Sequence, residues 1–176
     1  AERALLAADA VAAVSRHDLA GLEAAVRRER LFLMPPFIDA AAFSPGRPPG
    51  GAEAGAPVRI LAAAMMRLGR KADSYRVLAD ALAELRADGH RFTLTVAGDG
   101  PERGTVERMF AGLPATFLDR VPFEAMPGIY ASHDLFAWPA IDEPYGLVFL
   151  EAQASGLAVV GSDARGVPDI VSAGTT

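Results

Sequence analysis

Apolar residues in the second half of the chain form short continuous runs that alternate with segments of helical spacing. The run at 58–65 is nearly continuous in apolar residues, which is typical of a strand buried on both faces, and 92–97 is the next strand candidate. Between them, residues 74–86 carry Tyr75, Leu78, Leu82 and Leu85 at helical intervals. Strands that alternate with helices in this way predict an α/β fold with a parallel sheet covered on both sides.

The same rhythm continues to the end of the sequence. We expect helices at 102–112, 123–131 and 146–155, strands at 116–118, 135–138 and 158–161, and the start of a further helix at 168–172. This order predicts a doubly wound, Rossmann-like sheet.

The first third of the chain has a different pattern. Residues 1–30 show an Ala/Leu/Val helical pattern that breaks at 15–18, and residues 31–34 form a short strand candidate closed by Pro35 and Pro36. Residues 44–57 are rich in Pro, Gly and Ala without an apolar period, which indicates an exposed linker. We therefore divide the chain into residues 1–43, a linker at 44–57, and an α/β domain at 58–176.

Composition excludes several classes of protein. The 176 residues are 51% hydrophobic, and the net charge of −5 without any block of Lys or Arg argues against binding to nucleic acid. The absence of cysteine rules out disulfides and cysteine-based metal sites. No apolar run reaches the ~18 residues that a transmembrane helix needs, and no signal segment is seen at the N-terminus. These features agree with a cytoplasmic protein, among others.

Candidate site residues follow the predicted strands. In doubly wound sheets, ligands bind beyond the carboxyl ends of the strands, where loops lead into helix N-termini. The residues that we expect at this edge are Arg67, Gly69 and Lys71 after the first strand, Gly98, Asp99 and Gly100 after the second, Val121 and Pro122 after the third, and residues 142–147 after the fourth.

Two cations near the first of these strands suit a diphosphate. Arg67 offers a planar fork of donors and Lys71 a mobile point charge. The free amides of Leu147 and Val148, at the expected start of a helix, also favour phosphate. The alternative is that Arg67, Arg70 and Lys71 are solvated loop charges.

Two glutamates, Glu143 and Glu151, stand with seven residues between them, the first in a Pro-Tyr-Gly break and the second inside an apolar helix. Glu151 lies about 7–8 Å along the helix from Gly146. Between Leu150 and Ala152 it is expected to be partly buried, where an unpaired carboxylate is costly. A ligand with hydroxyls at both ends and a charged linker between them, such as a nucleotide-sugar, fits this pattern. The alternative is a pair of surface glutamates.

The ordered set of motifs resembles a known family. Besides Arg67 and Lys71, it comprises AGDGP at 97–101, VPFEAMPGIYASHDLFAWPA at 121–140, the E-x7-E motif from Glu143 to Glu151, EAQASGLAVV at 151–160 and GVPDIV at 166–171. Residues 58–173 resemble the C-terminal, donor-binding domain of a GT-B glycosyltransferase of the retaining GT4 family (glycosyl transferases group 1).

The resemblance implies roles for matching residues. Arg67 and Lys71 would bind the donor diphosphate and stabilise the leaving group, and Glu143, the third catalytic residue, would contact the donor sugar. Glu151 would hold the ribose, while Tyr145, Gly146 and Leu147 would line the pocket with Gly98, and Val121 would flank the base. Two departures from the family pattern are Tyr145, where Phe is more common, and a short loop at 67–71, which leaves Arg70 as an alternative to Lys71.

Residues 1–43 resemble the end of the family's N-terminal, acceptor-binding domain. We therefore expect a fragment whose second domain is incomplete at its end, and which alone binds donor weakly and transfers nothing. The acceptor stays open among lipid, polysaccharide and small molecule, as does peripheral membrane contact through the missing domain.

No cofactor or metal is expected, because the family works without the Asp-x-Asp metal motif and this sequence has none. His133 is interpreted as a helix-end residue. The run from Gly98 fails the dinucleotide-binding fingerprint because Arg103 occupies the position of the third glycine. Two alternatives to a sugar transferase remain: a GT-B enzyme such as a nucleotide-sugar epimerase, and a non-catalytic nucleotide-binding module.

Overall fold

The computed structural model describes residues 2–46 and 55–174. Its main feature is a five-stranded parallel sheet in the order β5-β4-β3-β6-β7, which confirms the predicted fold class. The strands of the sheet are β3 (Val58–Ala63), β4 (Phe92–Ala97), β5 (Ala115–Leu118), β6 (Leu135–Trp138) and β7 (Ala158–Gly161), and the helices between them are α3 (Arg70–Ala87), α4 (Arg103–Met109), α5 (Met126–Ala131) and α6 (Leu147–Ala154).

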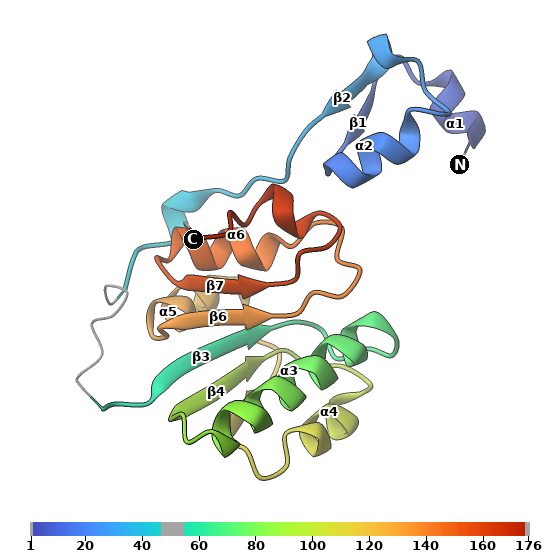
Figure 1. The fold of residues 1–176 in the computed structure, drawn as a ribbon. Coiled ribbons are helices and arrows are strands. Elements are labelled where there is room, and N and C mark those ends of the chain that lie inside the picture. The colour runs from blue at the N-terminus through green and yellow to red at the C-terminus, as the bar shows by residue number, and fades with distance from the viewer. Residues whose placement is uncertain (1, 47–54, 175–176) are drawn as a thin grey trace.

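The sheet is wound in two directions from β3. The chain first moves outward through β4 to β5, and α3 and α4 cover one face on the way. It then returns to the other side of β3 for β6 and β7, and α5 and α6 cover the opposite face (Figure 1). Neighbouring strands β3 and β6 therefore send their following loops in opposite directions, which opens a crevice between the loops at the carboxyl edge.

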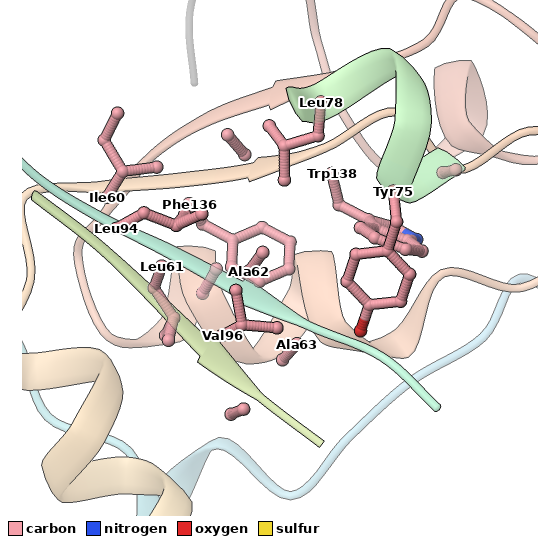
Figure 2. Close-up of a cluster of buried hydrophobic side chains, with 14 of the residues drawn as sticks. Ile60, Leu61, Ala62, Ala63, Tyr75, Leu78, Leu94, Val96, Phe136 and Trp138 are labelled. Carbon is pink, nitrogen blue, oxygen red and sulfur yellow. The ribbon is translucent and has the colours of Figure 1, made fainter. Parts of the chain in front are cut away.

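The central strands form the middle of the hydrophobic core. Leu61, Val96 and Phe136 are completely buried, which agrees with the largely apolar sequences of their strands. Figure 2 shows Tyr75 of α3 beside Trp138 of β6, and their ring centroids lie 4.8 Å apart. Helix α3 is thereby fixed on the strand whose carboxyl end leads to the loop of Glu143.

The N-terminal segment corrects one prediction. Instead of a helical run broken at 15–18, it contains α1 (Glu2–Ala7), β1 (Val11–Ala13), α2 (Arg16–Leu22) and β2 (Leu31–Leu33). The strand at residues 11–13 pairs in parallel with the predicted strand at residues 31–33. Ser15 accepts a hydrogen bond from the Asp18 amide at 3.0 Å, so the expected break is the N-cap of α2. An alanine-rich pattern does not distinguish a helix from a short strand that pairs far along the chain.

This N-terminal unit lies beyond the β7 side of the sheet (Figure 1). It contacts the sheet domain where the amide of Arg16 donates to Asp169 at 2.7 Å. After β2, the chain passes through short 3-10 turns such as Ala40–Ala42, and Phe43 packs against Tyr130 with ring centroids 6.1 Å apart. The predicted linker at 44–57 falls mostly outside the described residues.

Several helix boundaries differ from the prediction. Helix α4 ends at Met109 instead of residue 112, and the first three residues of the expected helix at 123–131 form a 3-10 turn. Helix α3 begins at Arg70, four residues earlier than expected, because Gly69 serves as its N-cap with φ 77°. The expected helix at 168–172 is a 3-10 turn at Val167–Asp169. Within the described ranges, no helix is long and apolar enough to cross a membrane.

Candidate functional site

The candidate residues gather at the carboxyl edge of the sheet. Because all five strands are parallel, the loops after β3, β4, β5 and β6 open at this edge, as the sequence predicts. Two adjoining pockets lie there, of about 550 and about 370 Å³. They share Ala64, Met65 and Met126, so together they form one bent crevice.

The larger hollow, which we call the β4 pocket, lies over the loop that follows β4. Its polar lining comes from Arg67, Asp99 and Arg120, with Met126 at the border to the second pocket. The other residues that line it are Ala64, Met65, Ala97, Gly98, Gly100, Pro101 and Val121.

Close backbone packing makes the floor of the β4 pocket. A Cβ on Gly98 would lie 2.1 Å from the carbonyl oxygen of Ala64, and one on Gly100 would lie 2.2 Å from that of Met66. The amide of Met66 donates to the carbonyl of Asp99 at 3.0 Å. Any larger residue at either glycine would push the β3 and β4 loops apart and change the pocket.

The second hollow, which we call the α6 pocket, lies at the start of helix α6. It brings together three charged side chains, Lys71 of α3, Glu143 of the loop before α6 and Glu151 of α6. The remaining residues that line it are Ala63, Ala64, Met65, Met126, Tyr130, Tyr145, Gly146, Leu147 and Val148.

An ion pair links the two sides of the α6 pocket. Lys71 Nζ in the first turn of α3 donates to Glu143 Oε2, although the residues are 72 positions apart. Both side chains keep some exposure, 31% for the lysine and 17% for the glutamate. Ser74 ties the same elements together, since its buried hydroxyl donates to Arg70 O and accepts from the amide of Ile141. Helix α3 therefore holds the loop that carries Glu143.

That loop has an unusual backbone. Ala140 and Asp142 have positive φ values of 52° and 59°, which few residues other than glycine adopt. Asp142 is held by two cations, Arg70 at 3.5 Å and Arg165 at 2.5 Å. Such local strain persists only where the surroundings enforce it, and it is common at functional sites. Because Arg70 pairs with Asp142 and does not line either pocket, Lys71 is the better placed of the two alternative cations.

The N-terminus of α6 borders the α6 pocket. Gly146 adopts the left-handed conformation with φ 63° and caps the helix. The amides of Leu147 and Val148 lie in the first turn, where a helix offers no internal acceptor. Their partial positive charge favours an anion at this place.

Glu151 reaches the same pocket from within α6. Its Oε2 accepts a hydrogen bond of 2.8 Å from the hydroxyl of Tyr130 in α5. The side chain is half-buried, as predicted from its apolar neighbours. Burial raises the pKa of the Glu151 carboxyl, and the bond from Tyr130 lowers that pKa in part. The carboxylate is thus held at some cost in a place where a ligand with hydroxyls could pair with it.

All nine sequence-predicted site residues line this crevice. Arg67, Gly98 and Val121 line the β4 pocket, and the other six, Lys71, Glu143, Tyr145, Gly146, Leu147 and Glu151, line the α6 pocket. Their individual roles stay predictions.

The sequence did not indicate several lining residues, among them Tyr130, Met126 and Arg120. Tyr130 and Met126 sit in a stretch that reads simply as an apolar helix, and Arg120 reads as a loop charge. A tyrosine among the buried positions of a helix was the one available signal, because a buried hydroxyl needs a partner.

Other candidate groups play no part in the crevice. His133 follows α5, and its Nδ1 lies 2.7 Å from the carbonyl of Ile129, which agrees with its interpretation as a helix-end residue. Among residues 2–46 and 55–174, no cluster of three or more His, Cys, Asp or Glu could hold a metal ion.

Comparison with known proteins gives a consistent picture. The model of the family glycosyl transferases group 1 matches residues 57–176. The D-inositol 3-phosphate glycosyltransferase of Nocardia farcinica is 33% identical over 163 residues, which cover 85% of this chain and 36% of that protein. A GDP-mannose-dependent alpha-(1-6)-phosphatidylinositol dimannoside mannosyltransferase of Mycobacterium tuberculosis is 35% identical over 118 residues, covering 66% and 31%. The chain thus spans about a third of the length of these curated relatives.

Solved structures share the fold. Sucrose-phosphate synthase from Thermosynechococcus elongatus superposes with a TM-score of 0.73 at 24% identity, covering 94% of this chain and 43% of that one. The C-terminal domain of a glycosyl transferase group 1 family protein from Francisella tularensis gives a TM-score of 0.55 at 20% identity, covering 77% and 75%. At these identities the likeness shows the fold alone.

Proposed function

Because the chain belongs to the glycosyl transferases group 1 family, we propose that it carries the donor site of a retaining glycosyltransferase. The enzyme would move a sugar from a nucleotide-sugar to an acceptor hydroxyl, with retention at the anomeric carbon. The observation that carries this proposal is the convergence of Lys71, Glu143 and Glu151 with the N-terminus of α6 in one pocket.

The two pockets match the parts of such a donor. The base would lie in the β4 pocket near Val121, against a floor of glycine backbone. The ribose would reach Glu151, and the diphosphate would lie between Arg67, Lys71 and the amides of Leu147 and Val148. Volumes of about 550 and 370 Å³ fall in the range of ~300–1,000 Å³ of small-molecule sites.

Lys71 and Glu143 would exchange their ion pair for contacts with the donor when it binds. An incoming diphosphate competes with the carboxylate for the lysine. When Lys71 turns to phosphate, Glu143 is released to accept hydrogen bonds from sugar hydroxyls. Both side chains are then paired again, so the donor replaces an internal contact and leaves no buried charge alone.

Catalysis would depend on the charge of the departing nucleoside diphosphate. As the bond between the anomeric carbon and the phosphate oxygen breaks, negative charge grows on that oxygen. Arg67 and Lys71 stabilise this charge more in the transition state than in the bound substrate, which is the condition for acceleration. The residues of the crevice are able to do this without a resident cofactor, so we propose that none is needed.

Thermal shift of the intact protein with UDP, GDP and ADP tests the donor site first. GDP is the leading probe, since the name of one relative specifies GDP-mannose. A ligand that binds only the folded form raises the melting temperature. We expect a shift with one of the three that is lost in Glu151→Ala and kept in Arg76→Ala, an exposed control on α3. No shift with any nucleotide would contradict the donor site.

Turnover with UDP- and GDP-sugars then separates the alternatives. Free nucleotide together with a glycoside of retained configuration supports the transferase. An epimerised donor would instead identify an epimerase, and binding without turnover a non-catalytic module. The acceptor, whether lipid, polysaccharide or small molecule, is identified from the glycoside that forms. Membrane contact at the cytoplasmic surface is a further part of the same proposal.

A further inference from the structure

Tyr130 donates a side-chain hydrogen bond to Glu151. Tyr130 is fully buried in α5, yet its hydroxyl extends to the α6 pocket and donates to Glu151 Oε2 at 2.8 Å. A phenylalanine would fill the same apolar space without this bond. The hydroxyl therefore needs an explanation other than packing.

We propose that Tyr130 is a positioning residue, which fixes Glu151 so that its second carboxylate oxygen faces the ribose hydroxyls of the donor. The inference rests on the proposed function, because it assigns a support to the residue expected to hold the ribose. A carboxylate that accepts from the tyrosine through one oxygen keeps the lone pairs of the other for a ligand. The bond also selects one rotamer of a side chain that otherwise loses rotational freedom on binding.

The aromatic ring of Tyr130 is itself rigidly held. It packs edge-on against Phe43 with centroids 6.1 Å apart, and at a tilt against Phe136 at 5.9 Å. These contacts fix the direction of the hydroxyl before any ligand arrives. Support of this kind, from a buried neighbour on a separate helix, is what keeps a binding group in its productive orientation.

The charge on Glu151 depends on the same bond. Burial raises the pKa of the carboxyl, and the hydrogen bond from Tyr130 works in the opposite direction. The other titratable groups that line the pocket are Lys71 of α3 and Glu143 and Tyr145 of the loop before α6. Loss of the tyrosine hydroxyl should thus shift protonation of Glu151 to higher pH and weaken its acceptance of ribose hydroxyls.

The test compares two buried tyrosines. Tyr130→Phe removes the hydroxyl bound to Glu151, and Tyr75→Phe removes an equally buried hydroxyl that donates to the carbonyl of Ala64 at 2.7 Å. For each intact protein, calorimetry measures binding of the preferred nucleotide among UDP, GDP and ADP, and of its 2′,3′-dideoxy form. The ratio of the two affinities reports contact with ribose, and a general loss of structure leaves that ratio unchanged.

We expect Tyr130→Phe to reduce the preference for the ribonucleotide about tenfold, the effect of one hydrogen bond to a charged group. As the pH is lowered, Tyr130→Phe should also lose its affinity for the ribonucleotide at a higher pH than the wild type does. Tyr75→Phe should keep both the ratio and the pH profile. In a Glu151→Gln background, Tyr130→Phe should change the ratio little, because its partner is already altered.

An unchanged ratio and pH profile in Tyr130→Phe would overturn the inference while leaving the donor site intact. Wild-type protein that binds no nucleotide, or binds both forms equally, would overturn the proposed role of Glu151 and the inference with it. Should Tyr130→Phe fail to fold, 3-fluorotyrosine in the wild-type chain gives a second measurement. The ¹⁹F resonance of Tyr130 should then respond to the ribonucleotide more than to the dideoxy form, and an equal response would contradict the inference.

Discussion

Two ion pairs link the β3–α3 segment to residues that flank β6, one near each end of these two strands. At the amino end, the guanidinium of Arg59 donates to both carboxylate oxygens of Asp134 at 3.0 and 2.7 Å. The backbone amide of Arg59 also donates to Asp134 Oδ2 at 2.9 Å, and the amide of Asp134 donates to the carbonyl of Arg59. This hydrogen bonding raises the pKa of Arg59. At the carboxyl end, Lys71 meets Glu143 through a single contact beside an open pocket. The pair of Arg59 and Asp134 fixes the two strands to each other. The pair of Lys71 and Glu143 leaves further donors on the lysine and acceptors on the glutamate available for exchange.

The backbone also differs between the two ends, at Asp134 and at Glu143. Asp134 lies directly before β6, and its amide donates to the carbonyl of Arg59 at 2.9 Å, in continuity with the sheet. Glu143 follows two positions of positive φ, Ala140 and Asp142, in a loop that must be held by Ser74 and by neighbouring cations. The same pair of strands thus carries a fixed end and an end followed by a strained loop of the kind that is common at functional sites.

The largest effect should appear in kcat/KM when the cation of each pair, Lys71 or Arg59, is replaced separately by methionine. Lys71→Met should lower kcat/KM of sugar transfer by about 10²–10³-fold, as expected for loss of one group that stabilises developing charge. Arg59→Met should leave kcat/KM near the wild-type value. The measurement is transfer by the intact protein under conditions where each variant is folded. Equal losses in both variants would remove the distinction between the two ends.

The free energy of unfolding should depend more on the Arg59–Asp134 pair than on the Lys71–Glu143 pair, the opposite of the order for kcat/KM. Asp134→Ala removes the carboxylate that accepts from the guanidinium and the backbone amide of Arg59, and we expect a loss of about 1–3 kcal/mol in the free energy of unfolding. Glu143→Gln keeps an acceptor for Lys71 and should change stability by less than ~1 kcal/mol. Urea denaturation of the two variants measures both values. A larger loss for Glu143→Gln would mean that this pair, too, is primarily structural.

Much of this fold is predictable from sequence because the strands are buried on both faces. The limits of β4, β6 and β7 agree with prediction, since glycine, proline or polar residues lie close to the ends of these largely apolar segments. The start of α3 was missed because residues 70–74 include no large apolar side chain that would show the period. The strand at Val11–Ala13 was missed because its partner lies about 20 residues further along.

The candidate site was predictable in its composition but not in its contacts. Parallel strands require that their following loops share one edge, so Arg67, Gly98 and Glu143 were expected together. Nothing local in the sequence indicates that Lys71 pairs with Glu143 or that Tyr130 donates to Glu151. These contacts depend on the relative orientation of helices, which only the packed core determines.

We expect the half-buried carboxylate of Glu151 to lower the stability of the folded protein at neutral pH. Its folded-state pKa is raised by burial, so the folded protein holds this proton more tightly than the unfolded chain. Stability from this group therefore falls as the pH rises from the unfolded value of about 4.3 through the raised folded value. Glu151→Gln should melt at a higher temperature than the wild type at pH 7, by ~2–4 °C for each kcal/mol, and the gap should narrow near pH 4. A variant that melts lower at pH 7 would contradict this account of Glu151.

The smallest effect concerns His133, near the fixed end. Burial lowers the pKa of this histidine, and its Nε2 lies 2.8 Å from the hydroxyl of Thr95. A depressed folded-state pKa means that stability is present above the unfolded value of ~6.5 and is lost as the pH falls below it. The urea midpoint should drop between pH 7.5 and 5.5, and His133→Asn should reduce that drop. The crevice plays no part in this effect, so an equal drop in the variant would assign the pH dependence elsewhere.

The most direct test of the central claim is the ratio of affinities for a nucleotide-sugar and its nucleotide, measured by calorimetry on wild type and Glu143→Gln. If Lys71, Glu143 and Glu151 converge to hold one donor, the variant should lose most of the extra affinity that the sugar provides while it still binds the nucleotide. A ratio equal to that of the wild type would show that Glu143 does not face the sugar, and would contradict the donor site described for this crevice.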